Sequence, residues 1–230
     1  MSLLIMVSSV FGFPLLQNAI KEVMPVSHVS VEGEFQYISK EDIQSKIKPL
    51  IQDGYFALDL QEIQQAVMSL PWAEKVQVQR VWPDGINLRL YEQRPVVRWQ
   101  TDSLLNIRGE IFTPLNIQEF TFLPVLYGPI DQRQELLEIM YGLSTRLINQ
   151  DMRLTEFRVS NRQSWLLTME NGMTIQLGRF EPLNKLNLLL KAFVVLGSEL
   201  VNKIAYVDMR YPNGYAVRWR ENETISWSKS

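Results

Sequence analysis

The sequence contains no cysteine and a single histidine, His28, among its 230 residues. These absences exclude a thiolate nucleophile, a disulfide framework and a zinc site built from cysteine and histidine. No serine or carboxylate arrangement around His28 marks a catalytic triad. Glycine-rich loops that cradle phosphate groups are also missing, because neither a Walker-type run nor a Gly-x-Gly-x-x-Gly motif occurs. We therefore predict no catalytic activity, no cofactor, no metal and no small-molecule substrate.

An excess of basic charge is missing as well. Lys and Arg number 23 against 25 Asp and Glu, which leaves a formal net charge of -2 at pH 7. Nucleic-acid binding requires a concentrated basic face that neutralises phosphates, so we expect no nucleic-acid partner. Hydrophobic residues make up 46% of the chain, which is enough to bury one large core or two modest ones.

Charged residues are absent from the first 20 positions, and Lys21 is the first ion. A helix of about 20 residues spans about 30 Å, the thickness of the hydrocarbon layer of a bilayer. We therefore predict a membrane anchor over residues 1–24, and whether a longer anchor is truncated at residue 1 stays open. A signal peptide and a buried soluble helix remain alternatives, because six residues dilute the segment: Ser8, Ser9, Gly12, Pro14, Gln17 and Asn18.

Residues 25–94 have the periodicity of a small β-α-α-β-β domain. The pattern predicts a strand at 27–33, helices at 40–51 and 60–70, and strands at 73–82 and 85–92. Ser39 and Asp59 precede the two helices and are typical N-cap residues. The last two strands flank Pro83-Asp84-Gly85, a typical turn sequence. Two helices can cover one face of the resulting three-stranded sheet.

Residues 95–220 predict a second domain, followed by a short polar tail at 221–230. Pro95 follows the first domain without a flexible linker, because the next residues are already apolar and strand-like. The pattern predicts strands at 96–99, 104–107, 110–112, 122–127, 155–159, 165–169 and 173–177, and helices at 132–148 and 182–200. We expect an α+β chain whose second domain is a mainly antiparallel sheet with two helices.

The most informative stretch lies near the end of the second domain. Two runs rich in β-branched and aromatic residues, 203–211 and 215–219, flank Pro212-Asn213-Gly214 and predict a β-hairpin. Side chains alternate along a strand, so the second run has one face made of Tyr215, Val217 and Trp219 and another made of Ala216 and Arg218. Only the polar tail follows, which predicts an unpaired edge strand available to another chain.

An ordered series of motifs in this chain resembles the FtsQ/DivIB family of bacterial cell-division proteins, in its gammaproteobacterial form. The series includes Leu70-Pro-Trp-Ala-Glu-Lys-Val-Gln-Val-Gln-Arg-Val-Trp-Pro-Asp84, Leu123-Pro-Val-Leu-Tyr-Gly-Pro129 and Tyr206-Val-Asp-Met-Arg-Tyr-Pro-Asn-Gly-Tyr-Ala-Val-Arg-Trp219. The resemblance implies a POTRA domain over residues 25–94 and the family's β domain over 95–220. It also implies a single-pass inner-membrane protein whose bulk lies in the periplasm and which concentrates at the division septum.

The resemblance also implies partners. In that family the β domain recruits FtsB together with FtsL, and the POTRA domain is linked to FtsK and other division proteins. The positions that this implies for an FtsB site are Arg162, Arg210, Tyr211, Asn213, Gly214, Tyr215, Ala216, Val217 and Trp219. For Tyr211 and Trp219 a plain core-filling role is the alternative, because half of the side chains of a strand face inward.

Two other functions stay open at this point. A POTRA-containing chaperone or transport component would handle secreted or outer-membrane proteins, and it would be expected to have repeated POTRA units and a barrel of many long strands. A periplasmic hydrolase would require a polar pocket that holds a perturbed acid–base pair.

Overall fold

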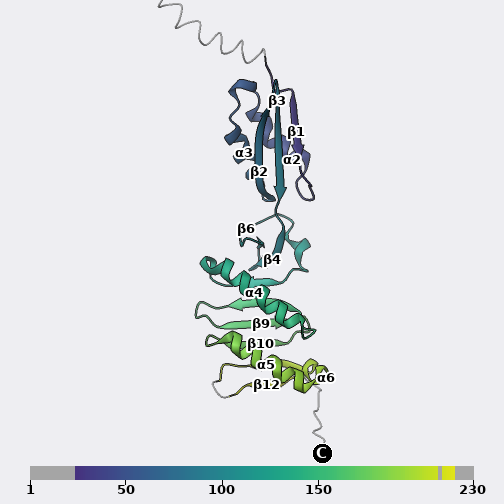
Figure 1. Cartoon of the computed structure of the whole chain (residues 1–230), viewed down its shortest axis with the longest axis vertical. Helices are drawn as coiled ribbons and strands as arrows, with labels where there is room; N and C mark the ends of the chain where they lie inside the picture. Colours follow the sequence, from purple (N-terminus) through teal and green to yellow (C-terminus); the bar gives the residue numbers. More distant parts are fainter. Residues whose placement is uncertain (1–23, 212–213, 221–230) are drawn as a thin grey trace, which may run out of the picture. The chain divides into compact units, whose positions relative to one another are not determined.

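The structure is a computed structural model that describes residues 24–211 and 214–220 (Figure 1). The predicted anchor, apart from Met24, the predicted tail at 221–230 and the predicted site residue Asn213 lie outside the described residues. The chain divides between Arg94 and Pro95 into two compact units, which we call the N-terminal unit and the C-terminal unit. Within residues 24–211 and 214–220, no helix is long and apolar enough to cross a membrane.

The N-terminal unit has the predicted β-α-α-β-β order. Its elements are β1 (His28–Glu32), α2 (Lys40–Ile47), α3 (Leu60–Met68), β2 (Ala73–Val81) and β3 (Gly85–Glu92), with short 3-10 turns η1 (Lys48–Leu50) and η2 (Tyr55–Ala57). The sheet order is β1-β3-β2, with β1 parallel and β2 antiparallel to the central strand β3. Each helix buries an apolar stripe, which includes Ile43 and Ile47 on α2 and Ile63 and Val67 on α3.

The two helices of this unit begin where the sequence predicts. Ser39 accepts a hydrogen bond from the Asp42 N–H while the Asp42 carboxylate accepts one from the Ser39 N–H, which is a complete capping box. The Asp59 side chain caps α3 by accepting hydrogen bonds from the backbone N–H groups of Gln61 and Glu62. The predicted end of the first helix is wrong, because α2 stops at Ile47 and the chain tightens into η1. Pro49 lies in that turn and has no N–H to continue the helical hydrogen bonds.

The carboxylate of Glu92 binds the segment between β1 and α2 to the end of β3. It accepts hydrogen bonds from the backbone N–H groups of Gln36, Tyr37 and Ile38 at 2.9, 3.0 and 2.6 Å. We expect Glu92→Ala to lower the free energy of unfolding by about 1–2 kcal/mol, because partly buried donors lose their acceptor. Glu92→Gln keeps an acceptor oxygen and should cost less. Urea denaturation checks this, and equal losses for both variants would contradict the role of the acceptor.

The C-terminal unit is built on one nine-stranded sheet. Its strands are β4 (Pro95–Trp99), β5 (Ser103–Asn106), β6 (Ile111–Phe112), β7 (Val125–Tyr127), β8 (Leu154–Val159), β9 (Trp165–Met169), β10 (Thr174–Gly178), β11 (Ile204–Asp208) and β12 (Ala216–Trp219). The helices are α4 (Arg133–Ile148), α5 (Pro182–Leu196) and α6 (Ser198–Asn202), with 3-10 turns η3 (Ile117–Phe120) and η4 (Ile130–Gln132). The strand order is β12-β11-β10-β9-β8-β7-β4-β5-β6 (Figure 1).

The predicted mainly antiparallel sheet is confirmed, because five of its eight strand pairs are antiparallel. Three parallel pairs and a third helix were not predicted. The pairs β4–β7, β7–β8 and β10–β11 are parallel, so the sheet is mixed. The strands β7 and β8 are connected through α4, and the strands β10 and β11 are connected through α5 and α6. Parallel neighbours need such a long crossover connection. The single helix predicted at 182–200 is broken at Gly197, whose φ of +79° is a left-handed conformation that ends a helix.

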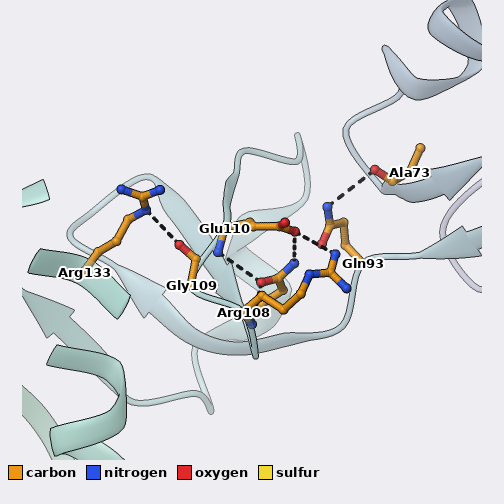
Figure 2. Close-up of polar contacts among 7 residues, drawn as sticks. Ala73, Gln93, Arg108, Gly109, Glu110 and Arg133 are labelled. Atoms are coloured by element: carbon orange, nitrogen blue, oxygen red, sulfur yellow. Dashed lines mark hydrogen bonds and ion pairs between the residues drawn. The ribbon is translucent and has the colours of Figure 1, made fainter. Parts of the chain in front are cut away.

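The β5–β6 turn is bound to the start of α4 by a polar network (Figure 2). The side-chain oxygen of buried Asn106 accepts from the N–H groups of Arg108 and Glu110 at 2.9 and 3.0 Å. The Glu110 carboxylate accepts from the Asn106 amide at 2.6 Å and from the Arg108 guanidinium at 2.8 Å. Arg133 Nε donates to the Gly109 carbonyl at 2.8 Å. The hydrogen bonds and nearby guanidinium groups lower the pKa of Glu110, with Arg108 contributing most.

Helices α4 and α5 cover one face of this sheet and form the core with it. Phe157 is fully buried at the centre, and its ring meets Trp165 edge to face with centroids 5.1 Å apart. The opposite face of the sheet is half-exposed. Apart from Leu166, the side chains there are polar or aromatic: Tyr127, Glu156, Thr168, Thr174, Gln176 and Tyr206. The core therefore fixes which side chain of each strand faces inward, including those of the last hairpin.

Candidate partner-binding edge

The strand β12 forms one edge of the nine-stranded sheet. Among the described residues it has one neighbouring strand, β11, with Tyr206 opposite Arg218 and Asp208 opposite Ala216. The predicted hairpin is confirmed. The connection is longer than the predicted Pro-Asn-Gly turn, because β11 ends at Asp208 and the Met209 N–H donates instead to the Gln176 carbonyl, 2.8 Å away.

The side chains of β12 alternate between the two faces of the sheet. Val217 and Trp219 are half-buried and pack against the core of the unit. Ala216 and Arg218 are exposed on the face of the sheet away from the core. On that face the Arg218 guanidinium lies 5.6 Å from the centre of the Tyr206 ring. The predicted alternation is thus confirmed for β12. Trp219 packs against the core, which agrees with the core-filling role given above as the alternative to FtsB binding.

The aromatic residues beside β12 are exposed. Tyr211 is 56% exposed and Tyr215 is 44% exposed, and Gly214 between them is also exposed. A core-filling role for Tyr211 is therefore excluded in this structure. Two rigid aromatic side chains beside an open strand edge form the kind of surface that anchors protein interfaces.

A carboxylate on β11 holds the arginine that follows it. Asp208 is buried and receives hydrogen bonds from Arg210 Nε at 2.9 Å, from Arg210 Nη2 at 2.6 Å and from the Arg210 backbone N–H at 3.0 Å. The Arg210 guanidinium therefore lowers the pKa of Asp208 against the opposing effect of burial, and the carboxylate raises the pKa of Arg210. Burial, helped by the Asp208 charge, raises the pKa of Tyr206.

The Asp208–Arg210 pair makes stability depend on pH. A carboxylate whose pKa is lowered by folding stabilises the fold above its unfolded pKa, 3.8, and loses that stabilisation as the pH falls through the lower folded value. We expect Asp208→Asn to lower the free energy of unfolding by about 1 kcal/mol at pH 7, because Arg210 is 58% exposed and water screens the pair. The difference between variant and unaltered chain should vanish well below pH 4.

Urea denaturation at a series of pH values measures this dependence. Glu170→Gln is the matched control, because Glu170 and Arg153 form an exposed ion pair at 3.4 Å and should contribute little at any pH. A pH-independent loss in Asp208→Asn would show that the carboxylate acts through packing and not through its charge.

Arg162 lies in the connection between β8 and β9, and its side chain is exposed. Within the described part of the chain it makes no ion pair. The Gln176 side chain donates to Ser164 Oγ and to the Trp165 carbonyl, both at 3.0 Å, and so links this connection to β10. The connection and the segment after β11 therefore lie at the same end of the sheet.

Two residues of this region escaped the sequence interpretation. Asp208 stands two positions before Arg210, and this spacing on a strand places both side chains on one face, a signal that could have been found. Phe180 is 66% exposed and stacks against the Arg179 guanidinium at 4.5 Å. It follows Gly178, where an added Cβ would lie 3.1 Å from Arg210 Cγ. No sequence signal brings Phe180 to this end of the sheet.

Comparison with known proteins decides the family. Residues 97–210 match the family model "Cell division protein FtsQ/DivIB, C-terminal", and residues 24–93 match "POTRA domain, FtsQ-type". The chain is 39% identical over 227 residues to the cell division protein FtsQ of Methylomonas methanica. This alignment covers 98% of this chain and 91% of the relative. The chain belongs to the FtsQ/DivIB family of cell-division proteins. The resemblance seen in its motifs is thereby confirmed.

Other FtsQ proteins align over similar lengths. The FtsQ of Shewanella oneidensis is 31% identical over 223 residues, 96% of this chain and 85% of the relative. The FtsQ of Coxiella burnetii is 29% identical over 220 residues, 96% of this chain and 90% of the relative.

The match to the FtsQ/DivIB C-terminal model ends at Arg210, so the exposed aromatics and β12 lie just beyond it. Within the described residues, His, Asp and Glu side chains form no group of three that could bind a metal ion.

Proposed function

We propose that this FtsQ family member is a non-catalytic cell-division scaffold that recruits FtsB, together with FtsL, by pairing a partner strand with β12. The proposal places residues 1–24 across the inner membrane, the bulk of the chain in the periplasm and the protein at the division septum. It assigns contacts with FtsK or other division proteins to the N-terminal unit, which matches the POTRA model.

The observation that carries the proposal is that, within residues 24–211 and 214–220, β12 pairs with a strand on one side only. Hydrogen-bonding groups alternate in direction along a strand. The Arg220 N–H donates inward to the Lys203 carbonyl at 2.9 Å, and the N–H of Met209, the residue after β11, donates away from β12 to Gln176 on β10. With this alternation, the N–H and C=O groups of Ala216 and Arg218 point toward β11. The N–H and C=O groups of Val217 and Trp219 therefore point away from β11, toward the outer side of the sheet. Such a row of groups is a template for an added strand.

Side chains around this edge supply selectivity under the proposal. Tyr211 and Tyr215 give exposed aromatic anchors, and exposed Gly214 allows a partner backbone to approach closely. Arg210 already faces the carboxylate of Asp208 in its own chain. Arg162 is the better candidate to pair with a partner carboxylate, because it makes no ion pair within the described residues.

The test is a titration of the full chain, reconstituted in lipid nanodiscs, with the periplasmic part of FtsB, combined with amide hydrogen exchange. We expect binding, with slower exchange at Val217 and Trp219, whose N–H groups become bonded. Binding without protection at β12 would place the site elsewhere on the chain. The absence of binding would reject recruitment of FtsB.

A further inference from the structure

Three large apolar side chains are the most exposed of their kind among the described residues of the N-terminal unit. Trp82 is 79% exposed, Phe56 is 59% exposed and Val81 is 49% exposed. We call these three residues the aromatic tip. Trp82 and Val81 stand at the turn between β2 and β3, and Phe56 is in the 3-10 turn η2.

The two segments of the aromatic tip lie side by side. Arg80, two residues before Trp82, donates from Nη2 to the Leu58 carbonyl at 2.5 Å. Its guanidinium also lies 5.7 Å from the centre of the Tyr55 ring, and that ring meets the Phe56 ring edge to face. The end of β2 is therefore held against the turn that carries Phe56.

The aromatic tip lies where the chain enters the unit. The Tyr55 N–H donates to the Met24 carbonyl at 2.9 Å, beside Phe56. The Ser27 N–H donates to the Asp84 carbonyl at 2.9 Å, in the turn that follows Trp82. The strands β1 and β3 start together at this end, with His28 opposite Gly85 (Figure 1). The His28 ring and the Asp84 carboxylate lie 3.3 Å apart there.

We propose that Phe56, Val81 and Trp82 insert into the interface of the lipid membrane in which residues 1–24 are anchored. The inference rests on the membrane placement in the proposed function. Six residues separate Ile20, the end of the uncharged run, from Ser27, and a fully extended chain of that length spans about 20 Å. The aromatic tip is thus held close to the surface from which the chain emerges. Tryptophan prefers this boundary, because its ring is apolar and its N–H stays near water.

Tryptophan fluorescence of the full chain tests the proposal. The chain is reconstituted in phosphatidylcholine vesicles with or without bromine on shallow acyl carbons, which quenches only nearby tryptophans. Residues 1–23 contain no tryptophan, Trp72, Trp99 and Trp165 are buried, and the sixth tryptophan, Trp227, is present in every sample that is compared. We expect the unaltered chain to be quenched and Trp82→Phe to lose most of that quenching. Trp219→Phe, the matched control on β12, should retain it.

Equal quenching of the unaltered chain and Trp82→Phe, or no quenching of either, would overturn the insertion of the aromatic tip. Flotation of the same samples separates this failure from failure of the anchor. A chain that floats with the vesicles while Trp82 is not quenched is anchored without insertion of the tip. A chain that does not float rejects the membrane placement itself, and the proposal falls with it.

Discussion

The Val217→Pro variant is expected to bind the periplasmic part of FtsB about 30- to 100-fold more weakly than the unaltered chain, a loss of about 2–3 kcal/mol. Proline has no N–H, so a buried carbonyl of the partner strand loses its donor, and the ring occupies the space of the partner backbone. The N–H of Val217 faces outward from β12, because the Arg220 N–H points inward to the Lys203 carbonyl and the direction of the N–H groups alternates along a strand. The hairpin itself should therefore survive, since edge strands tolerate proline where the N–H faces solvent.

Val217→Ala is the matched control for this variant. It trims the same half-buried side chain and keeps the N–H, so it reports the packing part of the effect alone. Titration calorimetry in nanodiscs gives the affinities, and circular dichroism with thermal unfolding shows that each variant is folded. If Val217→Pro and Val217→Ala bind equally well while both are folded, pairing through the β12 backbone is wrong.

Tyr211→Ala should cost about 2 kcal/mol of binding free energy, the size typical of an aromatic hot spot at the centre of an interface. Tyr211 is 56% exposed beside β12, so its removal leaves no cavity in the core. The same change at Trp219 would be harder to interpret, because Trp219 packs against the core and its loss would also weaken the fold.

Tyr141→Ala is the control for the loss of an exposed tyrosine. Tyr141 is 44% exposed on α4, which packs on β8 and β7, the strands four and five places from β12 in the sheet. The titration with FtsB should give an unchanged affinity for this variant and a reduced one for Tyr211→Ala. Equal affinities for the two variants would show that Tyr211 is not part of the FtsB site. The proposal would then depend on the backbone of β12.

Local features of the fold followed from the sequence, because they depend on neighbouring residues. Ser39 and Asp59 satisfy the first N–H groups of the helices behind them, whatever the rest of the chain does. The order β-α-α-β-β follows from periodicity in the same way. The alternation of Val217 and Trp219 against Arg218 is likewise a property of any strand. Family motifs, read together in order, supplied the cell-division assignment.

The tertiary structure decided which strands are neighbours. Periodicity marks a strand but not its partner, so the parallel pairs β4–β7 and β10–β11 were not predicted. The ion pair of Asp208 with Arg210 was not predicted either, although the two residues stand only two positions apart in the sequence. Among the described residues β12 pairs with β11 and with no other strand, and this places β12 at the edge of the sheet. The sequence by itself determined most of the elements, the family and the prediction that the last strand lies at an edge, whereas long-range pairing determined the neighbour of that strand and the aromatic tip.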